Sequence, residues 1–234
     1  MQTGTEPVRV SDVVDAVGRY RTRLGAQDID LPLVPISDDL AIALLITVDH
    51  GVRFAEQAGT ELAELLAPFE ADVVVSVATM GIPLAIEVTR ALGLDDYLIL
   101  QKTPKIHLRD ALSEPVSSIT TGKPQMLLFD RSRVSVVAGR RVAVVDDVIS
   151  TGASVCAALN ILRRVGAEPV VIGALLTEAS TWREALGEDA ALVHALGGIP
   201  VFRRQASGEL VEDWVGSSDR DIVQASTSTS TTDQ

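Results

Sequence analysis

Short, unbroken runs of valine, isoleucine and leucine are the feature that most limits how this chain can fold. Within each run, apolar residues follow one another without polar alternation, and turn residues bound the run. A strand buried on both faces of a parallel sheet has this pattern, whereas a strand with one solvated face alternates apolar and polar residues. Four clear runs and a weaker fifth are Asp72–Val77, Tyr97–Gln101, Arg141–Val145, Val170–Leu176 and Ala191–Leu196.

Helical patterns separate these strands, at Pro83–Leu92 after the first run and at Ser154–Val165 after the third. Alternation of strand and helix predicts an α/β fold with a doubly wound, mainly parallel sheet flanked by helices. Towards the N-terminus we expect two further helices, near Ser11–Leu24 and Asp38–Leu66, the second broken around Asp49–Gly51.

The length of 234 residues favours one domain with an appendage over two full domains. We expect a single domain over residues 1–216, with a core at about 71–196. A small hood would come from the N-terminal helices at about 1–70 and from the C-terminal segment 192–216. The polar stretch 217–234, which ends STSTSTTDQ, is predicted to be a disordered tail because it cannot bury enough apolar surface.

The charge balance limits the partners of the chain. A net charge of −12 disfavours nucleic acid and anionic membrane as partners. The lysines Lys102, Lys105 and Lys123 nevertheless fall in one stretch, which suits a small anionic ligand or, equally, a solvated surface. Cys156 is the only cysteine, and no apolar run reaches the ~18 residues of a membrane span. With no secretory h-region at its start, the chain is predicted to be cytoplasmic.

The most informative stretch is Val142–Ser154, VAVVDDVISTGAS, which leads from a predicted strand into a predicted helix. Ligands of open parallel sheets bind outside the carboxyl ends of the strands, and here that end carries Asp146 and Asp147. The turn Ser150–Ser154 then offers hydroxyls, backbone N–H groups and a helix N-terminus, which together suit a phosphate. Gly152 permits a close approach of the backbone or a positive φ.

Carboxylates and a phosphate cradle at one strand end suit different parts of one ligand. Carboxylates repel phosphate but accept hydrogen bonds from a vicinal diol, so the combination predicts a ribose 5-phosphate group. The alternative is an ordinary strand–turn–helix with two solvated acids and a capping serine.

The run VVDDVISTGAS resembles the signature with which type I phosphoribosyltransferases bind 5-phosphoribosyl-1-pyrophosphate (PRPP). In that signature four hydrophobic residues and two acids precede a T-G-x-[ST] turn, and the resemblance covers roughly residues 71–196. The turn after the first strand is similar to the family's pyrophosphate loop, and LQKTPK resembles the basic end of its second strand. The residues concerned are Ala78, Thr79, Met80 and Gly81 in the loop, and Lys102 and Lys105 in the basic segment.

The resemblance implies transfer of the phosphoribosyl group from PRPP to a nucleobase, with Mg²⁺ as cofactor and release of pyrophosphate. Asp146, Asp147 and Lys102 would carry the catalytic roles, and the two acids would hold Mg²⁺ indirectly, through PRPP and water. The turn of Ser150, Thr151, Gly152, Ala153 and Ser154 would bind the 5-phosphate. A homodimer is also expected.

The interval Lys102–Gly139 shows no clean helix, although loops of this length are uncommon in compact domains unless they act as lids or binding loops. We expect a mobile flap over the site, partly β near Gln125–Phe129. An irregular insertion without a functional role is the alternative.

Subfamily patterns leave the acceptor base open. Ser150 stands where hypoxanthine/guanine enzymes carry an acid/base Asp, and Thr120 stands where adenine enzymes carry a flap glutamate, with Glu114 as a conceivable substitute. The stretch 118–133 is closer to xanthine enzymes and to purine-operon repressors, while DDVISTG is also similar to orotate enzymes. We expect a purine base, with orotate transfer or non-catalytic PRPP sensing as alternatives. The acidic residues 1–70 lack the basic helix-turn-helix of a DNA-binding regulator, which favours the enzyme.

Base binding is expected under the hood. In a chain with 3% aromatic residues, Trp182 and Phe202 are the stacking candidates, and Glu178 is the candidate for reading a base edge. The alternative for each of the three is a purely structural role in packing.

Overall fold

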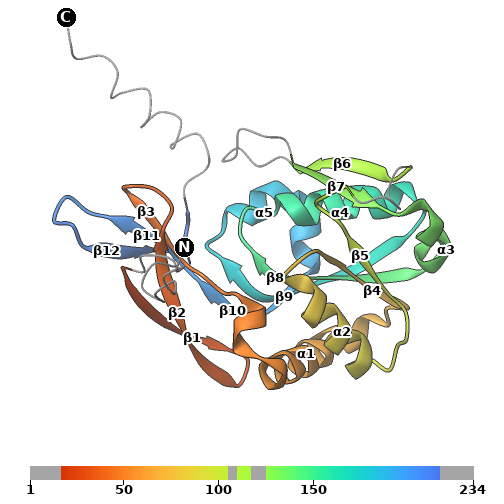
Figure 1. Ribbon diagram of the computed structural model, residues 1–234, viewed down its shortest axis with the longest axis horizontal. Coiled ribbons are helices and arrows are strands. Elements are labelled where there is room, and N and C mark those ends of the chain that lie inside the picture. The colour runs from red at the N-terminus through yellow and green to blue at the C-terminus, as the bar shows by residue number, and fades with distance from the viewer. Residues whose placement is uncertain (1–16, 105–109, 117–124, 217–234) are drawn as a thin grey trace, which may run out of the picture.

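The computed structural model describes residues 17–104, 110–116 and 125–216. These residues form two five-stranded sheets and a two-stranded ribbon (Figure 1). The predicted tail 217–234 lies outside the described residues. Within the described part of the chain, no helix has the length and apolar character needed to cross a membrane.

The central sheet has the strand order β10-β9-β8-β4-β5, and every neighbouring pair in it is parallel. It confirms the fold class and the predicted strands. Burial explains their sequences, because all five residues of β4 are buried, as are Val142–Val145 of β8. The strands are β4 (Val73–Val77), β5 (Tyr97–Leu100), β8 (Arg141–Ile149), β9 (Glu168–Glu178) and β10 (Val193–Ile199).

Helices cover both faces of this sheet (Figure 1). Buried residues of α1 (Val52–Leu66) and α2 (Gly81–Ala91) pack with Val74 and Ala143 in one hydrophobic cluster. Buried residues of α4 (Ala153–Arg164) and α5 (Thr181–Leu186) pack with the alternate strand residues in a second cluster. The remaining helical segments are short: η2 (Thr47–His50), η3 (Ala67–Phe69), η5 (Arg131–Arg133), α3 (Val134–Val137) and η6 (Gly187–Leu192).

The second sheet is the hood, and it corrects our prediction of helices over the described part of Ser11–Leu24 and over the first part of Asp38–Leu66, while residues 11–16 lie outside the described residues. It is antiparallel, with the order β1-β2-β3-β11-β12, and draws strands from both ends of the described chain. Only the helix from Val52 onward, after the expected break around Asp49–Gly51, is confirmed. The strands are β1 (Gly18–Leu24), β2 (Gln27–Pro35), β3 (Leu40–Ala43), β11 (Val201–Arg204) and β12 (Leu210–Asp213).

Alternating burial explains why these hood segments are strands. In β2, Ile29, Leu31 and Leu33 are buried, while the residues between them are more exposed. Side chains of a strand point alternately to its two faces, so this period of two places one apolar face on the core. A helix over the same residues would spread these three apolar side chains around its surface.

The predicted flap is only partly separate from the core. β6 (Leu112–Val116) and β7 (Gln125–Phe129) pair as an antiparallel ribbon, which confirms the strand predicted near Gln125–Phe129. Leu127, Phe129 and Val137 have no exposed surface, however, so the C-terminal part of Lys102–Gly139 belongs to the core. The parts 105–109 and 117–124 lie outside the described residues.

Candidate active site

A cavity of about 270 Å³ opens at the carboxyl ends of the central strands. From β4 the chain crosses to β5 on one side, while β8 pairs with β4 on the other side. Such a reversal of strand order is where open α/β sheets bind ligands, since the connecting loops diverge there. The lining residues lie at or just after the carboxyl ends of β4, β5 and β8: Val77–Met80, Lys102 and Asp146–Val155.

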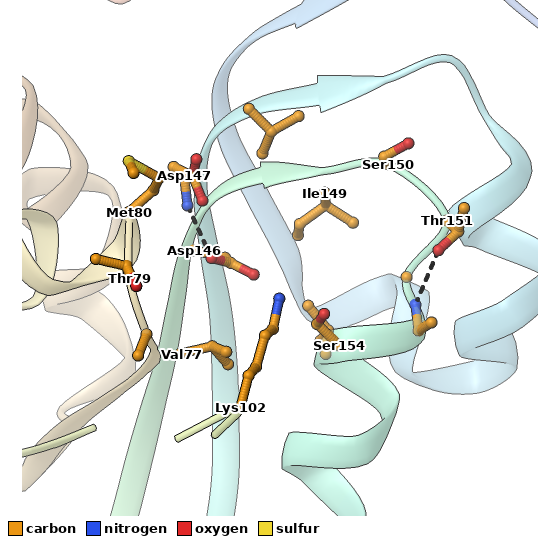
Figure 2. A pocket seen from close by; sticks show the side chains of 15 residues that line it. Val77, Thr79, Met80, Lys102, Asp146, Asp147, Ile149, Ser150, Thr151 and Ser154 are labelled. Atoms are coloured by element: carbon orange, nitrogen blue, oxygen red, sulfur yellow. Dashed lines mark hydrogen bonds between the residues drawn. The ribbon is translucent and has the colours of Figure 1, made fainter. Parts of the chain in front are cut away.

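The acid pair lies at the end of β8 (Figure 2). The backbone N–H of Asp147 donates to Asp146 Oδ1 at 3.1 Å, which ties the two residues together. Burial raises the pKa of Asp146 well above its ordinary value, and the nearby Asp147 carboxylate raises it further, while Lys102 acts in the opposite direction. Figure 2 shows the Lys102 side chain pointing into the cavity between Asp146 and Ser154.

The turn after β8 leads directly into helix α4. Gly152 has a φ of 78°, in the left-handed region that favours glycine, and α4 begins at the next residue. The Thr151 hydroxyl accepts a long hydrogen bond from the Ala153 N–H at 3.4 Å. The N–H groups of the first helical turn have no carbonyl partner within the helix, so they are available to an anion. Ser154 lies within that first turn and is not the N-cap, which is Gly152.

The loop after β4 forms the opposite wall of the cavity. The Ala78–Thr79 peptide bond is cis, and the Ala78 N–H donates to the Leu100 carbonyl at 2.9 Å. The buried Thr47 hydroxyl donates to the Met80 carbonyl at 2.9 Å, so a residue near the hood holds this loop. Gly81 begins α2, and a Cβ there would collide with Ser76 Oγ.

The structure brings most of the predicted site residues into one cavity. Gly81 is close by but is not in the lining, and Lys105 lies outside the described residues. Those that line it are Ala78, Thr79, Met80, Lys102, Asp146, Asp147, Ser150, Thr151, Gly152, Ala153 and Ser154.

The structure does not bring the two aromatic candidates for base stacking into this cavity. Trp182 is 2% exposed, and its indole N–H donates to the Ala179 carbonyl at 3.1 Å. Phe202 is 4% exposed and packs edge-on against Tyr20, with ring centroids 5.0 Å apart. Neither ring lines the cavity, because both are used in the hydrophobic clusters under the turn and the hood.

Two glutamates also take positions that the sequence did not indicate. Glu178, at the end of β9, is buried and accepts a hydrogen bond from the Ser150 hydroxyl, so it contacts the turn and is not in the cavity lining. Glu114 pairs with Arg164 of α4 at 2.7 Å and accepts from Asn160 at 3.1 Å, which commits it to the surface of that helix. The Ser150–Glu178 contact was missed, and its only sequence signal is an acid at the end of a predicted strand.

Among residues 17–104, 110–116 and 125–216, no group of three His, Cys, Asp or Glu side chains is placed to hold a metal ion. Mg²⁺ commonly combines one or two carboxylates with water and substrate phosphates, so the Asp146–Asp147 pair fits an ion that arrives with a diphosphate.

Comparison with known proteins agrees with this geometry. The family model described as "Phosphoribosyl transferase domain" matches residues 52–193. A probable purine biosynthesis transcriptional regulator of Streptococcus pneumoniae is 27% identical over 182 residues, covering 77% of this chain and 62% of that protein. A xanthine phosphoribosyltransferase of Brevibacillus brevis is 30% identical over 121 residues, covering 52% of this chain and 61% of that protein. The chain thus spans about three fifths of the length of these relatives.

Solved structures show the same fold. An adenine phosphoribosyltransferase from Thermoanaerobacter pseudethanolicus matches with a TM-score of 0.59 at 16% identity, covering 72% of this chain and 95% of that chain. A second, from Rhodothermus marinus, matches with a TM-score of 0.57 at 19% identity, covering 77% and 94%. Because the family model covers more than half of the sequence and includes both walls of the cavity, the chain belongs to the phosphoribosyl transferase domain family.

Proposed function

We propose that this protein transfers the 5-phosphoribosyl group of PRPP to a purine base and releases pyrophosphate. One observation carries the proposal: an acid pair, a lysine and the N-terminus of α4 line the same cavity at the strand-order reversal. The acid pair suits a ribose diol, the lysine suits a diphosphate, and the helix N-terminus suits a 5-phosphate.

Each wall of the cavity then has a role. The turn Ser150–Ser154 binds the 5-phosphate through backbone N–H groups and the Thr151 hydroxyl. Asp146 and Asp147 accept hydrogen bonds from the ribose hydroxyls. Lys102 and the loop Ala78–Met80 face the diphosphate, and the positive end of α2 lies behind that loop.

Catalysis would come from positioning and from electrostatics, without a covalent intermediate. The chain holds the ribosyl carbon in line between the leaving diphosphate and the attacking base nitrogen. When bound, Mg²⁺ would neutralise part of the negative charge on the leaving diphosphate. We propose that the flap predicted over Lys102–Gly139, which includes the ribbon of β6 and β7, excludes water from the site.

Purine is the proposed acceptor because the relatives include a xanthine and an adenine phosphoribosyltransferase. Orotate is the alternative, since an orotate phosphoribosyltransferase is 29% identical over 124 residues. Non-catalytic PRPP sensing is a second candidate, favoured by the similarity to the streptococcal regulator over 77% of this chain. Homodimer assembly and a cytoplasmic location stay predictions.

A panel of bases tests the proposal. Purified protein with PRPP and Mg²⁺ is incubated with adenine, guanine, hypoxanthine, xanthine, uracil or orotate, and pyrophosphate release is measured. Pyrophosphate release only with purine bases supports the proposal, and release only with orotate means that orotate is the acceptor base. PRPP binding without release on any base favours the sensor, and release without any base contradicts transfer.

A further inference from the structure

Two buried hydroxyl groups, those of Thr47 and Ser76, lie beside the loop that follows β4. Thr47 is 3% exposed, and Ser76 has no exposed surface. Within the described part of the chain, the Ser76 hydroxyl has no hydrogen-bond partner and only packs against Gly81. The Thr47 hydroxyl donates to the Met80 carbonyl at 2.9 Å, although 33 positions separate the two residues. Thr47 is therefore the buried hydroxyl that can direct the loop.

The loop is fixed at its start and at its end. At the start, the Ala78 N–H donates to the Leu100 carbonyl at 2.9 Å, which ties the loop to the end of β5. At the end, Met80 is the N-cap of α2, and no side chain of the described residues forms a capping hydrogen bond there. The residues from Ala78 to Met80 line the cavity. The bond from Thr47 thus secures the end of a cavity wall that has no cap of its own.

This bond also sets the direction of the Met80–Gly81 peptide unit. The unit is trans and planar, so its carbonyl and its N–H point in opposite directions. Because Thr47 holds the carbonyl, the Gly81 N–H is kept in the first turn of α2, where free N–H groups attract anions. Loss of the bond would leave this peptide unit free to rotate, and a carbonyl oxygen repels the anion that an N–H attracts.

Thr47 is itself held firmly, at the base of the hood. The hood strand β3 leads through Leu44 and Leu45 to Thr47, which begins η2. The Leu44 N–H donates to the Pro32 carbonyl of β2 at 2.9 Å, and Leu45 is 4% exposed. The Met80 carbonyl is therefore bound to the folded framework of the hood and not to a surface side chain.

We propose that Thr47 is a positioning residue for the diphosphate, whose hydrogen bond keeps the loop Ala78–Met80 in the shape that receives this group. The inference rests on the proposed function and assigns ligand selectivity to a residue outside the cavity lining. The turn Ser150–Ser154 forms the opposite wall. Loss of the Thr47 hydroxyl should therefore weaken ligands that carry a diphosphate and spare a ligand that carries only a 5-phosphate.

The first test compares three ligands by calorimetry on the full chain with Mg²⁺. Thr47→Val should bind PRPP and inorganic pyrophosphate about 3- to 10-fold more weakly, because one hydrogen bond fewer holds the competent shape of the loop. Its affinity for ribose 5-phosphate should be unchanged. Thr151→Val, on the opposite wall, should show the reverse selectivity, with weaker ribose 5-phosphate and unchanged pyrophosphate. In pyrophosphate-release assays Thr47→Val should raise the PRPP KM by the same factor and keep kcat, since saturating PRPP restores the loop.

The second test separates the hydrogen bond from packing. Thr47→Ser keeps the hydroxyl and loses a methyl group, so it should keep wild-type affinities even where it lowers Tm. Thr89→Val is the matched control, because Thr89 is also 3% exposed and its hydroxyl donates to the Ala85 carbonyl within α2, at 2.6 Å. It should leave all three affinities unchanged. If thermal unfolding shows that Thr47→Val does not fold, Thr47→Ala removes the same hydroxyl without an added methyl group.

The outcomes keep the two proposals apart. Selective loss of PRPP and pyrophosphate affinity in Thr47→Val, with rescue in Thr47→Ser, supports the positioning role. Wild-type affinities in Thr47→Val, or an equal loss for all three ligands, overturns that role and leaves the proposed function standing. A wild type that binds neither PRPP nor pyrophosphate overturns both.

Discussion

Replacing Gly152 with alanine tests whether the turn before α4 is built for a phosphate. Gly152 has a φ of 78°, where an L side chain is disfavoured by about 1–2 kcal/mol. A Cβ would also lie 3.3 Å from the Trp182 carbonyl oxygen and 3.4 Å from Ala185 Cβ, so a small crowding cost is added. At about 2–4 °C per kcal/mol for a chain of this size, Tm should fall by about 2–8 °C.

The same substitution at the other end of α4 is the matched control. Gly166 also has a φ of 78°, but a Cβ there meets nothing within 4 Å. Gly166→Ala should therefore lower Tm by a similar or slightly smaller amount and leave the PRPP KM unchanged. Gly152→Ala should raise the PRPP KM about tenfold or more, because loss of one hydrogen bond to a charged group costs about 1.5–3 kcal/mol.

Thermal unfolding and steady-state pyrophosphate release measure the two effects on the same samples. The assignment of the turn fails if Gly152→Ala lowers Tm as Gly166→Ala does and keeps a wild-type PRPP KM.

Three further substitutions probe the site and the core. Thr151→Val should raise the PRPP KM about 10- to 150-fold, since the hydroxyl accepts only weakly from Ala153 and can donate to phosphate. An unchanged KM would mean that the Thr151 hydroxyl does not bind PRPP. Asp146→Asn should abolish activity yet raise Tm at pH 7, because the raised pKa of Asp146 in the folded state makes its ionised form destabilising. At pH 3 the acid is protonated in both the folded and the unfolded state, so the gain in Tm should vanish. An equal gain in Tm at both pH values would refute this. Gly173→Ala should lower the free energy of unfolding by about 1–3 kcal/mol, because the new Cβ would lie 2.8 Å from Leu66 Cδ1. Denaturant unfolding of both single variants and the double variant with Leu66→Ala should show that the two effects are not additive. Additive effects would contradict this contact.

The sequence predicts the central sheet well because burial on both faces leaves a direct trace. β4 and β8 are apolar at successive positions, and the acids begin where β8 reaches the cavity. The hood was mispredicted because its strands are half-exposed. In β1, arginines alternate with Tyr20 and Thr22, and a pattern with so few apolar residues gives little basis for choosing between strand and helix.

The turn after β8 and the loop after β4 were predictable as cavity walls because each lies on one continuous segment. The Ser150–Glu178 contact was not, since it depends on the register between β8 and β9. That register pairs Ile149 with Thr177 and follows an irregularity at Val142/Ala143 that no local sequence pattern indicates. The single-domain organisation over residues 1–216 stays a prediction.

The burial of the two aromatic candidates could not be predicted for a different reason. A sequence shows that Trp182 and Phe202 are scarce and large, but it does not show which surface they cover. In the structure both complete hydrophobic clusters, where burying a large ring contributes most to stability.

A crystal structure of the protein with Mg²⁺ and PRPP tests the central claim most directly. We expect the 5-phosphate within hydrogen-bonding distance of the backbone N–H groups of Thr151–Ser154, the ribose hydroxyls at Asp146 and Asp147, and the diphosphate beside Lys102. Ligand density at another place on the molecule, or a phosphate on the Glu178 side of Ser150, would contradict the account.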